Sequence, residues 1–394
     1  MSSDLLAAAP PLTPVALCTP NIAGNEMRYV QECLASGWVS SVGAYVDRFE
    51  REFAAAVGAR HAVAVVNGTA ALHVALTLAG VQRDDEVIVP SLTFIAPANA
   101  VRYCGAWPAF LDVEPAHLQL DPAAVLRFLE SDCRREGTTI VNRHTGRRVT
   151  AVLAVDLLGH PSDTAVLGDL CAAYSLALIE DATESLGAVR RGVPVGGDAR
   201  YAAFSFNGNK LITTGGGGMF VTNDDALAAR ARYLTTQAKD DAVEFVHGEV
   251  GWNYRLTNVQ AAIGVAQLEQ LPTFVARKRA MRALYADQLS AVPHLRVLDE
   301  AAWATSAHWM LTIMLDAASP KSRVELAASL AELRIDTRPL WQPLHQSPAH
   351  RGAWSGACPV ATTAQQQALS LPCSTHLSDA ELARVAHAVI RSLS

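Results

Sequence analysis

Three short segments of the chain hold side chains suited to covalent and acid–base chemistry. Lys210 follows an apolar run and precedes four glycines, and Asp181 ends a second apolar run. Asn67-Gly68-Thr69 follows a third apolar run. Pyridoxal phosphate needs a lysine that condenses with its aldehyde, an acid that pairs with its ring nitrogen, and donors for its phosphate. The three segments supply these groups in the order phosphate donors (Asn67-Gly68-Thr69), aspartate and lysine, which predicts a pyridoxal phosphate site.

The segment Asn67-Gly68-Thr69 lies where the predicted strand 61–66 turns into the predicted helix 70–79. Free N–H groups at the start of a helix, together with the helix dipole, bind a phosphate dianion well. Gly68 would let the backbone approach the phosphate, and Thr69 would add a hydroxyl donor. An ordinary helix cap at Thr69 explains the same residues and is favoured if the segment is taken alone. With the lysine and the aspartate, the phosphate site is favoured.

Asp181 ends the apolar run 176–181 at the edge where α/β proteins place ligands. A buried carboxylate is costly without a cationic partner, and a protonated ring nitrogen is such a partner. The alternative is an aspartate that caps the next helix. Glu180 would face the opposite side of the strand. Glu184, three residues after Asp181, is a candidate for contact with the ring hydroxyl or a water.

Lys210 is predicted to anchor the cofactor covalently and to carry protons. The alternative is a solvated surface lysine, the commonest state of this residue. Its place after Phe204-Ser205-Phe206 and before the glycines argues against that alternative. Ser205 is predicted to be a second phosphate donor. Phe94 is as well suited to stacking on the cofactor ring as to core packing.

The alternation of short apolar runs with helical stretches predicts an α/β fold with a mainly parallel central sheet flanked by helices. A smaller α+β domain is expected to follow, so the predicted domains are 1–265 and 266–394. The polar segment 131–150, rich in arginine, is interpreted as a solvated excursion rather than a phosphate-binding lobe. The predicted strands are 61–66, 86–90, 108–112, 151–156, 176–181, 202–206, 218–222, 295–298 and 309–315, and the predicted helices include two within 24–58, 163–175, 266–291, 322–333 and a last one after Ser378.

Composition excludes several classes of protein. The chain has 394 residues, 50% of them hydrophobic, with a net charge of −6, which argues against a general nucleic-acid binder. The seven cysteines are scattered and form no CxxC pair, which favours reduced thiols in the cytoplasm over disulfides or a metal site. Met1–Pro11 is interpreted as a loose tail, and no membrane-spanning segment is expected.

Several segments in combination resemble the DegT/DnrJ/EryC1/StrS family of fold-type-I pyridoxal phosphate enzymes, which mostly aminate nucleotide-linked keto sugars. The resemblance runs from about residue 20 to the C-terminus. The segments 37–43 and 46–50 are similar to the branch that aminates UDP-linked 4-keto-6-deoxy-N-acetylhexoses on the way to bacillosamine- or legionaminate-type sugars. The segments that carry the resemblance are NGTAALHVAL, VIVPSLTFIAPANAV, LIEDATESLGA, AFSFNGNKLITTGGGGM and GWNYRLTNVQAAIG.

The resemblance implies a role for each matching residue. Lys210 would be the Schiff-base lysine, Asp181 the partner of the ring nitrogen, and Phe94 the cover of the ring. Asn253 would reach the phosphate from the neighbouring subunit, which implies a homodimer with a shared site. The remaining implied residues are Gly68, Thr69 and Ser205 for the phosphate, Glu184 where many members carry Gln or His, and Trp38, Ser40, Gly43, Arg338 and His345 as weaker candidates for the sugar-nucleotide cleft.

The expected activity is an aminotransferase that moves an amino group from glutamate, which leaves as 2-oxoglutarate, to a nucleotide-linked keto sugar. A sugar dehydratase of the same family is the first alternative, but those members carry His where this chain has Lys210. A non-catalytic sugar-nucleotide-binding regulator is the second, and it would be expected to lose the lysine or the aspartate. A dinucleotide oxidoreductase is disfavoured because no GxGxxG follows the first strand.

Overall fold

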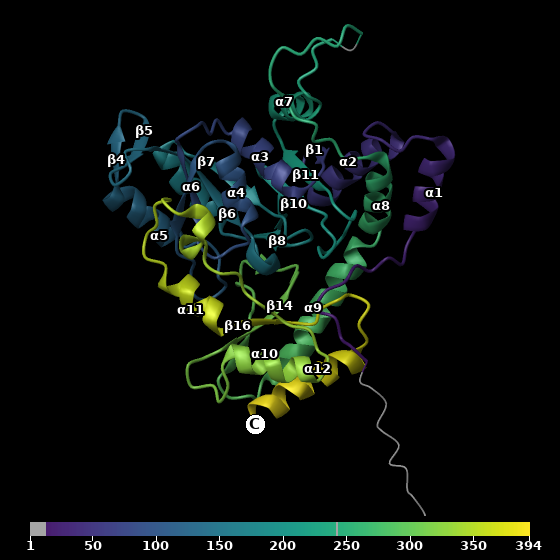
Figure 1. Cartoon of the computed structure of the whole chain (residues 1–394), viewed down its shortest axis with the longest axis vertical. Helices are drawn as coiled ribbons and strands as arrows, with labels where there is room; N and C mark the ends of the chain where they lie inside the picture. The colour runs from purple at the N-terminus through teal and green to yellow at the C-terminus, as the bar shows by residue number, and fades with distance from the viewer. Residues whose placement is uncertain (1–12, 242) are drawn as a thin grey trace, which may run out of the picture.

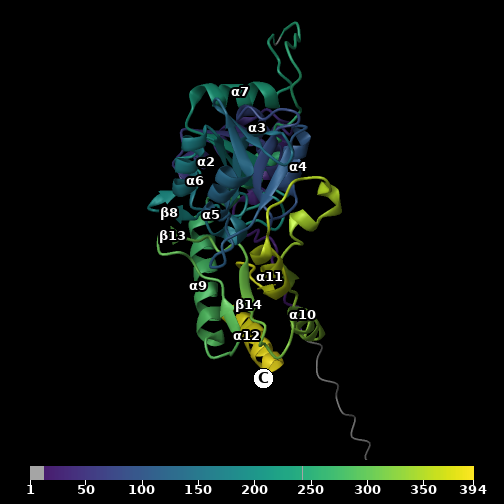
Figure 2. The ribbon, with the colours of Figure 1, turned by 90° about the vertical axis from the view of Figure 1, so that its left-hand side faces the viewer.

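A computed structural model describes residues 13–241 and 243–394 and shows a large α/β part above a smaller part (Figure 1). The predicted tail Met1–Pro11 lies outside the described residues. Helix α9 runs from the large part down into the small one, where α10 and α12 pack near the C-terminus (Figures 1 and 2). The residues predicted to bind the cofactor all belong to the large part, and the small part packs against it.

The central sheet has nine strands in the order β1-β11-β10-β7-β6-β2-β3, with β5 added to β6 and β4 added to β5. The pairings from β10 through β7, β6 and β2 to β3 are parallel. Strand β11 pairs antiparallel with both β1 and β10, so the sheet is mixed at its margins. The strands are β1 His61–Val65, β2 Glu86–Pro90, β3 Trp107–Leu111, β4 Cys133–Glu136, β5 Thr139–Asn142, β6 Arg148–Val155, β7 Ala177–Asp181, β10 Ala202–Ser205 and β11 Gly218–Thr222.

Helices cover both faces of this sheet because its strands are apolar on both faces. Phe204 packs in the same core as Phe49 and Phe53 of α2, whereas its neighbour Ala203 packs with α3 on the other side. Successive side chains of a strand point to opposite faces, which gives this division. The helices of the large part are α1 Glu26–Ser36, α2 Ala44–Val57, α3 Gly68–Leu78, α4 Ala96–Tyr103, α5 Pro122–Arg127, α6 Thr164–Tyr174, α7 Asp225–Thr235 and α8 Asn258–Leu268.

The arginine-rich segment 131–150 forms the antiparallel hairpin β4–β5, which extends the central sheet. A π-helical turn, Phe128–Asp132, leads into it. Arg148 pairs with Asp85 at 2.7 Å, and Arg147 approaches Glu86 at 3.4 Å. These charges hold the start of β6 beside the start of β2, and the hairpin pairs with β6, so this polar segment is an ordered part of the sheet.

The small part is built on an antiparallel sheet in the order β12-β14-β16-β15. The prediction of one helix over 266–291 is wrong, because α8 ends at Leu268 and α9 begins at Leu271 with Pro272 in its first turn. Proline suits that position, where its missing N–H has no helical acceptor. The elements are α9 Leu271–Leu289, α10 Arg323–Glu332, α11 Pro359–Gln367, α12 Asp379–Leu393, β12 Leu295–Val297, β14 Leu311–Leu315, β15 Arg338–Pro339 and β16 Ala368–Leu371.

A short sheet and the N-terminal segment join the large and small parts in addition to α9. The short sheet β13-β8-β9 pairs Ala304–Thr305 (β13) with Val189–Arg190 (β8), which also pairs with Val193–Pro194 (β9). The N-terminal segment packs against the small part: the N–H of Val15 donates to the Arg334 carbonyl at 2.9 Å. The predicted boundary at residue 265 stays a prediction. Single 3₁₀ turns occur at Leu157–Gly159, Leu344–Gln346 and Pro348–His350.

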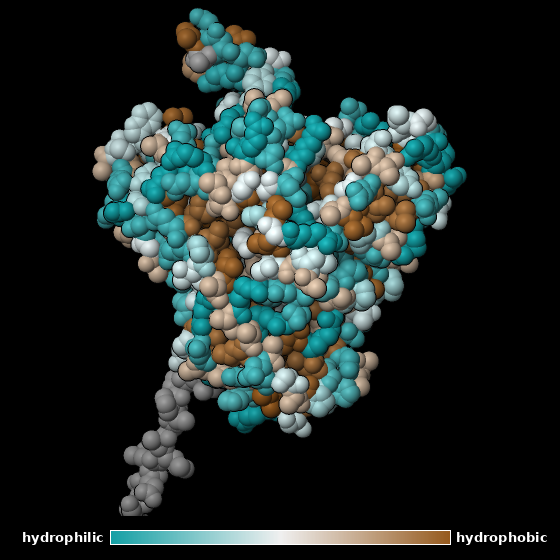
Figure 3. All heavy atoms as spheres, turned by 180° about the vertical axis from the view of Figure 1, so that it is seen from behind, coloured by the Kyte–Doolittle hydropathy of each residue, from teal (hydrophilic) through white to brown (hydrophobic). Residues whose placement is uncertain are grey.

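A segment between α7 and α8 projects from the large part (Figures 1 and 3). It carries exposed apolar side chains, among them Val243 at 82% and Val250 at 85% exposure. In residues 13–241 and 243–394, no helix combines the length and the apolar character needed to span a membrane. Within the same residues, no group of three or more His, Cys, Asp or Glu side chains is placed to hold a metal ion.

Candidate active site

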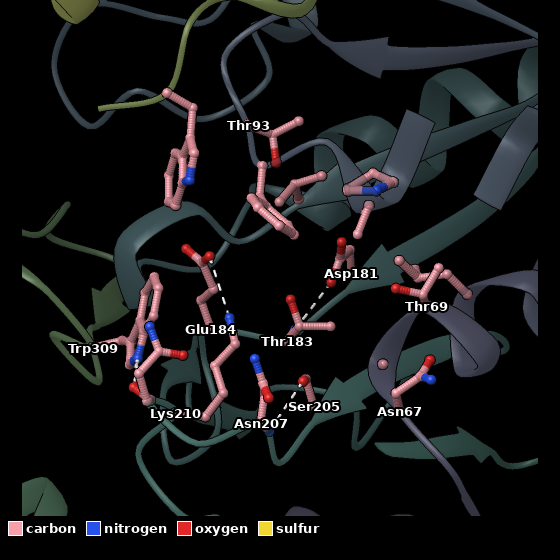
Figure 4. A pocket seen from close by; sticks show the side chains of 18 of the residues that line it. Asn67, Thr69, Thr93, Asp181, Thr183, Glu184, Ser205, Asn207, Lys210 and Trp309 are labelled. Carbon is pink, nitrogen blue, oxygen red and sulfur yellow. Dashed lines mark hydrogen bonds and ion pairs between the residues drawn. The ribbon is translucent and has the colours of Figure 1, made fainter. Parts of the chain in front are cut away.

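A cavity of about 300 Å³ lies at the carboxyl ends of β1, β7 and β10 (Figure 4). This edge is where parallel sheets place their ligands. The cavity brings together eight of the predicted site residues from distant parts of the chain. They are Gly68, Thr69, Phe94, Asp181, Glu184, Ser205, Lys210 and Arg338.

One end of the cavity is a backbone cradle at the start of α3. Asn67 is the helix cap, since its Oδ1 accepts from the N–H of Ala70 at 2.8 Å, so the alternative of a cap at Thr69 is wrong. The N–H groups of Gly68 and Thr69 in the first turn therefore lack helical acceptors. A Cβ on Gly68 would lie 2.7 Å from the Ser205 Cβ and 3.1 Å from its Oγ. Only glycine leaves this space open, and the donors around it fit a phosphate.

Asp181 occupies the last position of β7, where it pairs in register with Ala203 of β10. Its side chain is buried, which raises the pKa of the carboxyl to about 6, against the lowering effect of hydrogen bonds from Thr183. Its Oδ1 accepts from the Thr183 N–H at 3.1 Å, and no helix begins there. The helix-cap alternative is therefore wrong. A protonated ring nitrogen would supply the positive charge that this buried carboxylate needs.

Lys210 extends into the centre of the cavity (Figure 4). Its side chain is 13% exposed, so the alternative of a solvated surface lysine is wrong. Nζ lies 3.4 Å from Oε1 of Glu184 and 4.0 Å from the ring centroid of Trp309. The backbone turns tightly here, with the Lys210 N–H donating to the Asn207 carbonyl at 3.0 Å. These contacts present the amine to the cavity without saturating its three donors.

Glu184 is held opposite Lys210 by a backbone contact. Its Oε2 accepts from the N–H of Leu158 at 2.8 Å, and Leu158 adopts a left-handed conformation with φ of 60°. Burial raises the pKa of the Glu184 carboxyl, and the charge of Lys210 opposes that rise. The neighbouring Glu180 turns away from the cavity, as predicted, and pairs with Arg190 at 2.5 Å.

The open side of the cavity is aromatic and basic. Phe94 is 50% exposed and lies 6.2 Å from Trp341 in an edge-to-face arrangement, so the core-packing alternative for Phe94 is wrong. Arg338 lines the same side. Sequence reasoning missed Trp341 and Trp309, which come from the small part, and Thr183, which follows Asp181 by two residues. Thr183 could have been predicted from the sequence, because it lies in the same motif as Asp181.

Five predicted residues lie outside the cavity lining. His345 contacts the hydroxyl of Ser91 instead. Trp38, Ser40 and Gly43 belong to the connection between α1 and α2, and Asn258 binds the carbonyl oxygens of the first two. Asn253 is exposed on the same chain and bridges to Thr236. Their roles at a sugar or at a neighbouring subunit's site stay predictions.

The fold and the cavity define a pyridoxal phosphate-dependent aminotransferase. The chain belongs to the DegT/DnrJ/EryC1/StrS aminotransferase family, whose sequence model matches residues 20–390. This confirms the expected family, fold type and cofactor.

Curated relatives and solved structures agree with this assignment. EpsN of Bacillus subtilis, assigned as a pyridoxal phosphate-dependent aminotransferase, is 41% identical over 85% of this chain and 83% of its own. GDP-perosamine synthase of Caulobacter vibrioides is 38% identical over 94% and 96%. The aminotransferase TlmJ of Streptoalloteichus hindustanus superposes with a TM-score of 0.86 at 31% identity, covering 96% of this chain and 98% of its own.

When bound, pyridoxal phosphate supplies an electron sink that stabilises negative charge on the carbon next to the transferred nitrogen. Lys210 would hold it covalently through Nζ and, once released, carry a proton to and from that carbon. Asp181 would keep the ring nitrogen protonated. Gly68, Thr69 and Ser205 would hold the phosphate, and the indole of Trp309 keeps water from one side of Nζ.

Proposed function

We propose that this enzyme transfers an amino group from glutamate to C4 of a nucleotide-linked 4-keto-6-deoxy sugar, for the synthesis of surface-polysaccharide or glycan sugars. The observation that carries the proposal is a cavity that joins Lys210, Asp181 and the phosphate cradle and is also lined by Phe94 and Arg338. A sugar ring packs well on an aromatic face, and a guanidinium suits a diphosphate or a carboxylate.

The relatives support a nucleotide-linked sugar but differ in the sugar itself. Some are named GDP-perosamine synthase, and one from Streptomyces venezuelae, 35% identical, is named dTDP-3-amino-3,4,6-trideoxy-alpha-D-glucose transaminase. The segment 37–43 supports amination at C4 and a UDP carrier by its likeness to one branch of the family. We therefore propose C4 and UDP as the combination to test first.

The proposal includes a homodimer with a shared active site. Asn253 follows the projecting segment 237–250, whose exposed Val243 and Val250 would be covered in a dimer. The last turn of α1 and the connection after it add the exposed side chains of Leu34 and Trp38. Light scattering on the purified protein tests the dimer, and a monomer at micromolar concentration would contradict it. A cytoplasmic location is proposed from the seven free thiols.

The experiment that tests the activity uses glutamate labelled with ¹⁵N in its amino group. The purified enzyme is incubated with the label and a panel of UDP-, GDP- and dTDP-linked 3-keto and 4-keto sugars, and the products are analysed by mass spectrometry. A 4-keto-6-deoxy sugar that acquires ¹⁵N supports the proposal. Label only in 3-amino products would overturn the C4 assignment, and label in no sugar would overturn the proposed substrate class.

A further inference from the structure

Trp309 joins the active site to a second buried lysine. Its indole N–H donates to the Asn209 carbonyl at 2.7 Å, and its ring lies under the Lys210 amine. Its own backbone carbonyl accepts from Nζ of Lys278, in α9, at 2.8 Å. Trp309 therefore contacts the reactive Lys210 directly and connects Lys278 and Asn209 to it.

Lys278 is a buried cation without a carboxylate. Its side chain is 1% exposed, and Nζ donates to the carbonyls of Trp309 and Cys373, the latter at 2.6 Å. Among the ion pairs of residues 13–241 and 243–394, none involves this amine, whereas Lys210 has Glu184. A buried ammonium is costly unless an anion lies near it. The groups beside Lys278 that can become anionic are the thiols of Cys18 and Cys373.

The two thiols lie on neighbouring segments and contact the active-site network. The backbone N–H of Cys373 donates to the Leu17 carbonyl at 2.7 Å, and the N–H of Thr19 donates to the Ser374 hydroxyl at 2.9 Å, which fixes the two chain segments side by side. The Cys18 thiol donates to the Asn209 carbonyl at 3.4 Å, and the Cys373 sulfur lies 3.6 Å from the Trp309 carbonyl. Cys18 is partly exposed and Cys373 is fully buried.

The charge distribution separates this pair from the other five cysteines. The hydrogen bond from Cys18 and the charge of Lys278 outweigh burial and lower the pKa of the Cys373 thiol to about 5, while the same hydrogen bond raises the pKa of Cys18. Burial alone lowers the pKa of Lys278, but the two thiols reverse that effect and raise it. Burial raises the thiol pKa in all the others, Cys33, Cys104, Cys133, Cys171 and Cys358.

We propose that Cys18 and Cys373 form a redox-sensitive pair that a peroxide oxidises reversibly to a disulfide, and that this disulfide disturbs the position of Lys210 through Asn209. A thiolate held beside a partly exposed partner thiol is the arrangement from which protein disulfides form. The inference concerns regulation and does not depend on which sugar the enzyme aminates.

The oxidation balances with hydrogen peroxide as the oxidant. Cys18 passes its proton to Cys373, and its sulfur attacks one peroxide oxygen; the O–O bond breaks, and the released hydroxide takes the proton from Cys373 and leaves as water. Cys18 is then a sulfenic acid. The Cys373 thiolate attacks that sulfur, the S–S bond forms, the S–O bond breaks, and the hydroxide leaves as water with a proton from solvent. Each sulfur loses one electron and the peroxide gains two.

The disulfide would act on the site in two ways. The Cys18 thiol no longer donates to the carbonyl of Asn209, the residue that precedes Lys210. The negative charge at Cys373 is also lost, so Lys278 is left without its counter-charge beside Trp309. Both changes act on residues in direct contact with the Lys210 amine or its backbone.

The first test maps the disulfide chemically. The reduced enzyme, loaded with pyridoxal phosphate, is treated with peroxide, its remaining thiols are alkylated under denaturing conditions, and the peptides are identified by mass spectrometry. We expect a cross-linked Cys18–Cys373 peptide that dithiothreitol reverses, with the other five cysteines alkylated as internal controls. Cys18 and Cys373 alkylated as fully as those five would overturn the proposal.

The second test measures the thiolate and its effect on activity. Thiolate absorbance at 240 nm should show a step well below the ordinary thiol pKa of about 8.5 in the wild type and not in Cys373→Ser. Peroxide should lower the transamination rate about tenfold, since small displacements at a reacting centre are costly, and Cys18→Ser should resist this loss. A wild type without the low-pH step contradicts the thiolate, and a disulfide that leaves the rate unchanged contradicts the coupling to Lys210.

Discussion

Lys210 and Lys278 are both removed from water, yet their surroundings suit opposite roles. The amine of Lys210 lies at 3.4 Å from Glu184 and over the Trp309 ring, and it borders a cavity. The amine of Lys278 makes short hydrogen bonds of 2.8 and 2.6 Å to two backbone carbonyls. Burial alone therefore does not make a lysine reactive. Reactivity needs free space at the nitrogen and partners that the amine can leave.

The backbone reinforces this difference. Lys210 follows β10 in a loop, while Lys278 lies within the continuous helix α9. A loop residue can move its amine between a cofactor and a substrate at low cost, whereas a helical residue is fixed by its turn. Lys210 is therefore placed to move during the reaction, whereas Lys278 is fixed and stabilises the packing of α9.

The largest expected effect separates the two lysines by chemistry. Lys210→Met removes the covalent anchor and the proton carrier, so the visible absorption band of the holoenzyme should disappear and the transamination rate should fall by about 10⁴-fold or more. Lys278→Met is the matched control, because it removes an amine of the same length and should keep the band. A Lys210→Met enzyme that retains the band and normal turnover would defeat the comparison.

Asp181→Asn tests the charge that faces Lys210 from across the cavity. An amide does not keep the ring nitrogen protonated, so the rate should fall by about 10³-fold while the cofactor stays bound.

In the cofactor-free protein, Asp181→Asn should increase the free energy of unfolding, although it lowers the rate of the holoenzyme. Burial raises the pKa of Asp181 from 3.8 to about 6, so the folded state keeps its proton longer than the unfolded state. As pH rises from about 4 to 6, the wild type therefore loses stability that Asp181→Asn retains, by about 3 kcal/mol for the two units. Urea unfolding at pH 3.5 and pH 7 measures this. A gap of the same size at both pH values would contradict it.

Glu381→Gln is the control of opposite sign. Hydrogen bonds from Ser378 at the start of α12 lower the pKa of Glu381. Its stabilising effect is present above its unfolded pKa and is lost as pH falls through the folded one. Glu381→Gln should therefore be less stable than the wild type near neutral pH and equally stable in acid. The stability gain of Asp181→Asn is specific if the free energies of unfolding of the two variants change in opposite directions near neutral pH.

The comparison also shows what the sequence predicts well. Lys210, Asp181 and Gly68 lie in local motifs, each at the end of an apolar run, and the ends of parallel strands meet at one edge. The predicted strands match β1, β2, β3, β7, β10 and β11 within one residue, because a strand buried on both faces has no polar interruption. Strand β6 begins three residues before the predicted 151, at Arg148, because its first residues pair with a hairpin that the sequence did not predict. These properties are local, so the sequence shows them directly.

The residues around Lys278 show what the sequence does not predict. Cys18 and Cys373 are separated by most of the chain, and no periodicity relates them to Lys278 or Trp309. Their contact depends on how the N-terminal segment packs against the small part. The segment 131–150 is a similar case, because Asp85 and Glu86 balance Arg148 and Arg147 only in the folded protein.

Lys278→Met should affect stability more than chemistry. It leaves the carbonyls of Trp309 and Cys373 without donors and the Cys373 thiolate without a cation, so unfolding should become easier by about 3 kcal/mol. The 240 nm step of the thiolate should also move toward the ordinary thiol range. Urea unfolding and ultraviolet titration measure the two effects. Unchanged stability together with an unchanged step would show that Lys278 has no anionic partner.

Glu184→Gln makes the smallest change, because it keeps the side-chain size and the contact with the Leu158 N–H. It removes the negative charge 3.4 Å from the Lys210 amine. That charge favours the protonated form of the nitrogen, so its removal disfavours this form. In the holoenzyme, the pH at which the visible band changes should therefore fall by about one unit. Glu52→Gln is the control, since Glu52 pairs with Arg48 on the surface.

A spectrophotometric pH titration of the three proteins decides the matter. If the midpoint falls in Glu184→Gln and stays in Glu52→Gln, the carboxylate at 184 stabilises positive charge on the reactive nitrogen. The contrast with Lys278 then rests on the kind of partner: a carboxylate tunes the lysine that reacts, and carbonyls with a thiolate fix the one that does not. A midpoint that is the same in Glu184→Gln and the wild type would assign Glu184 to holding the Leu158 turn alone.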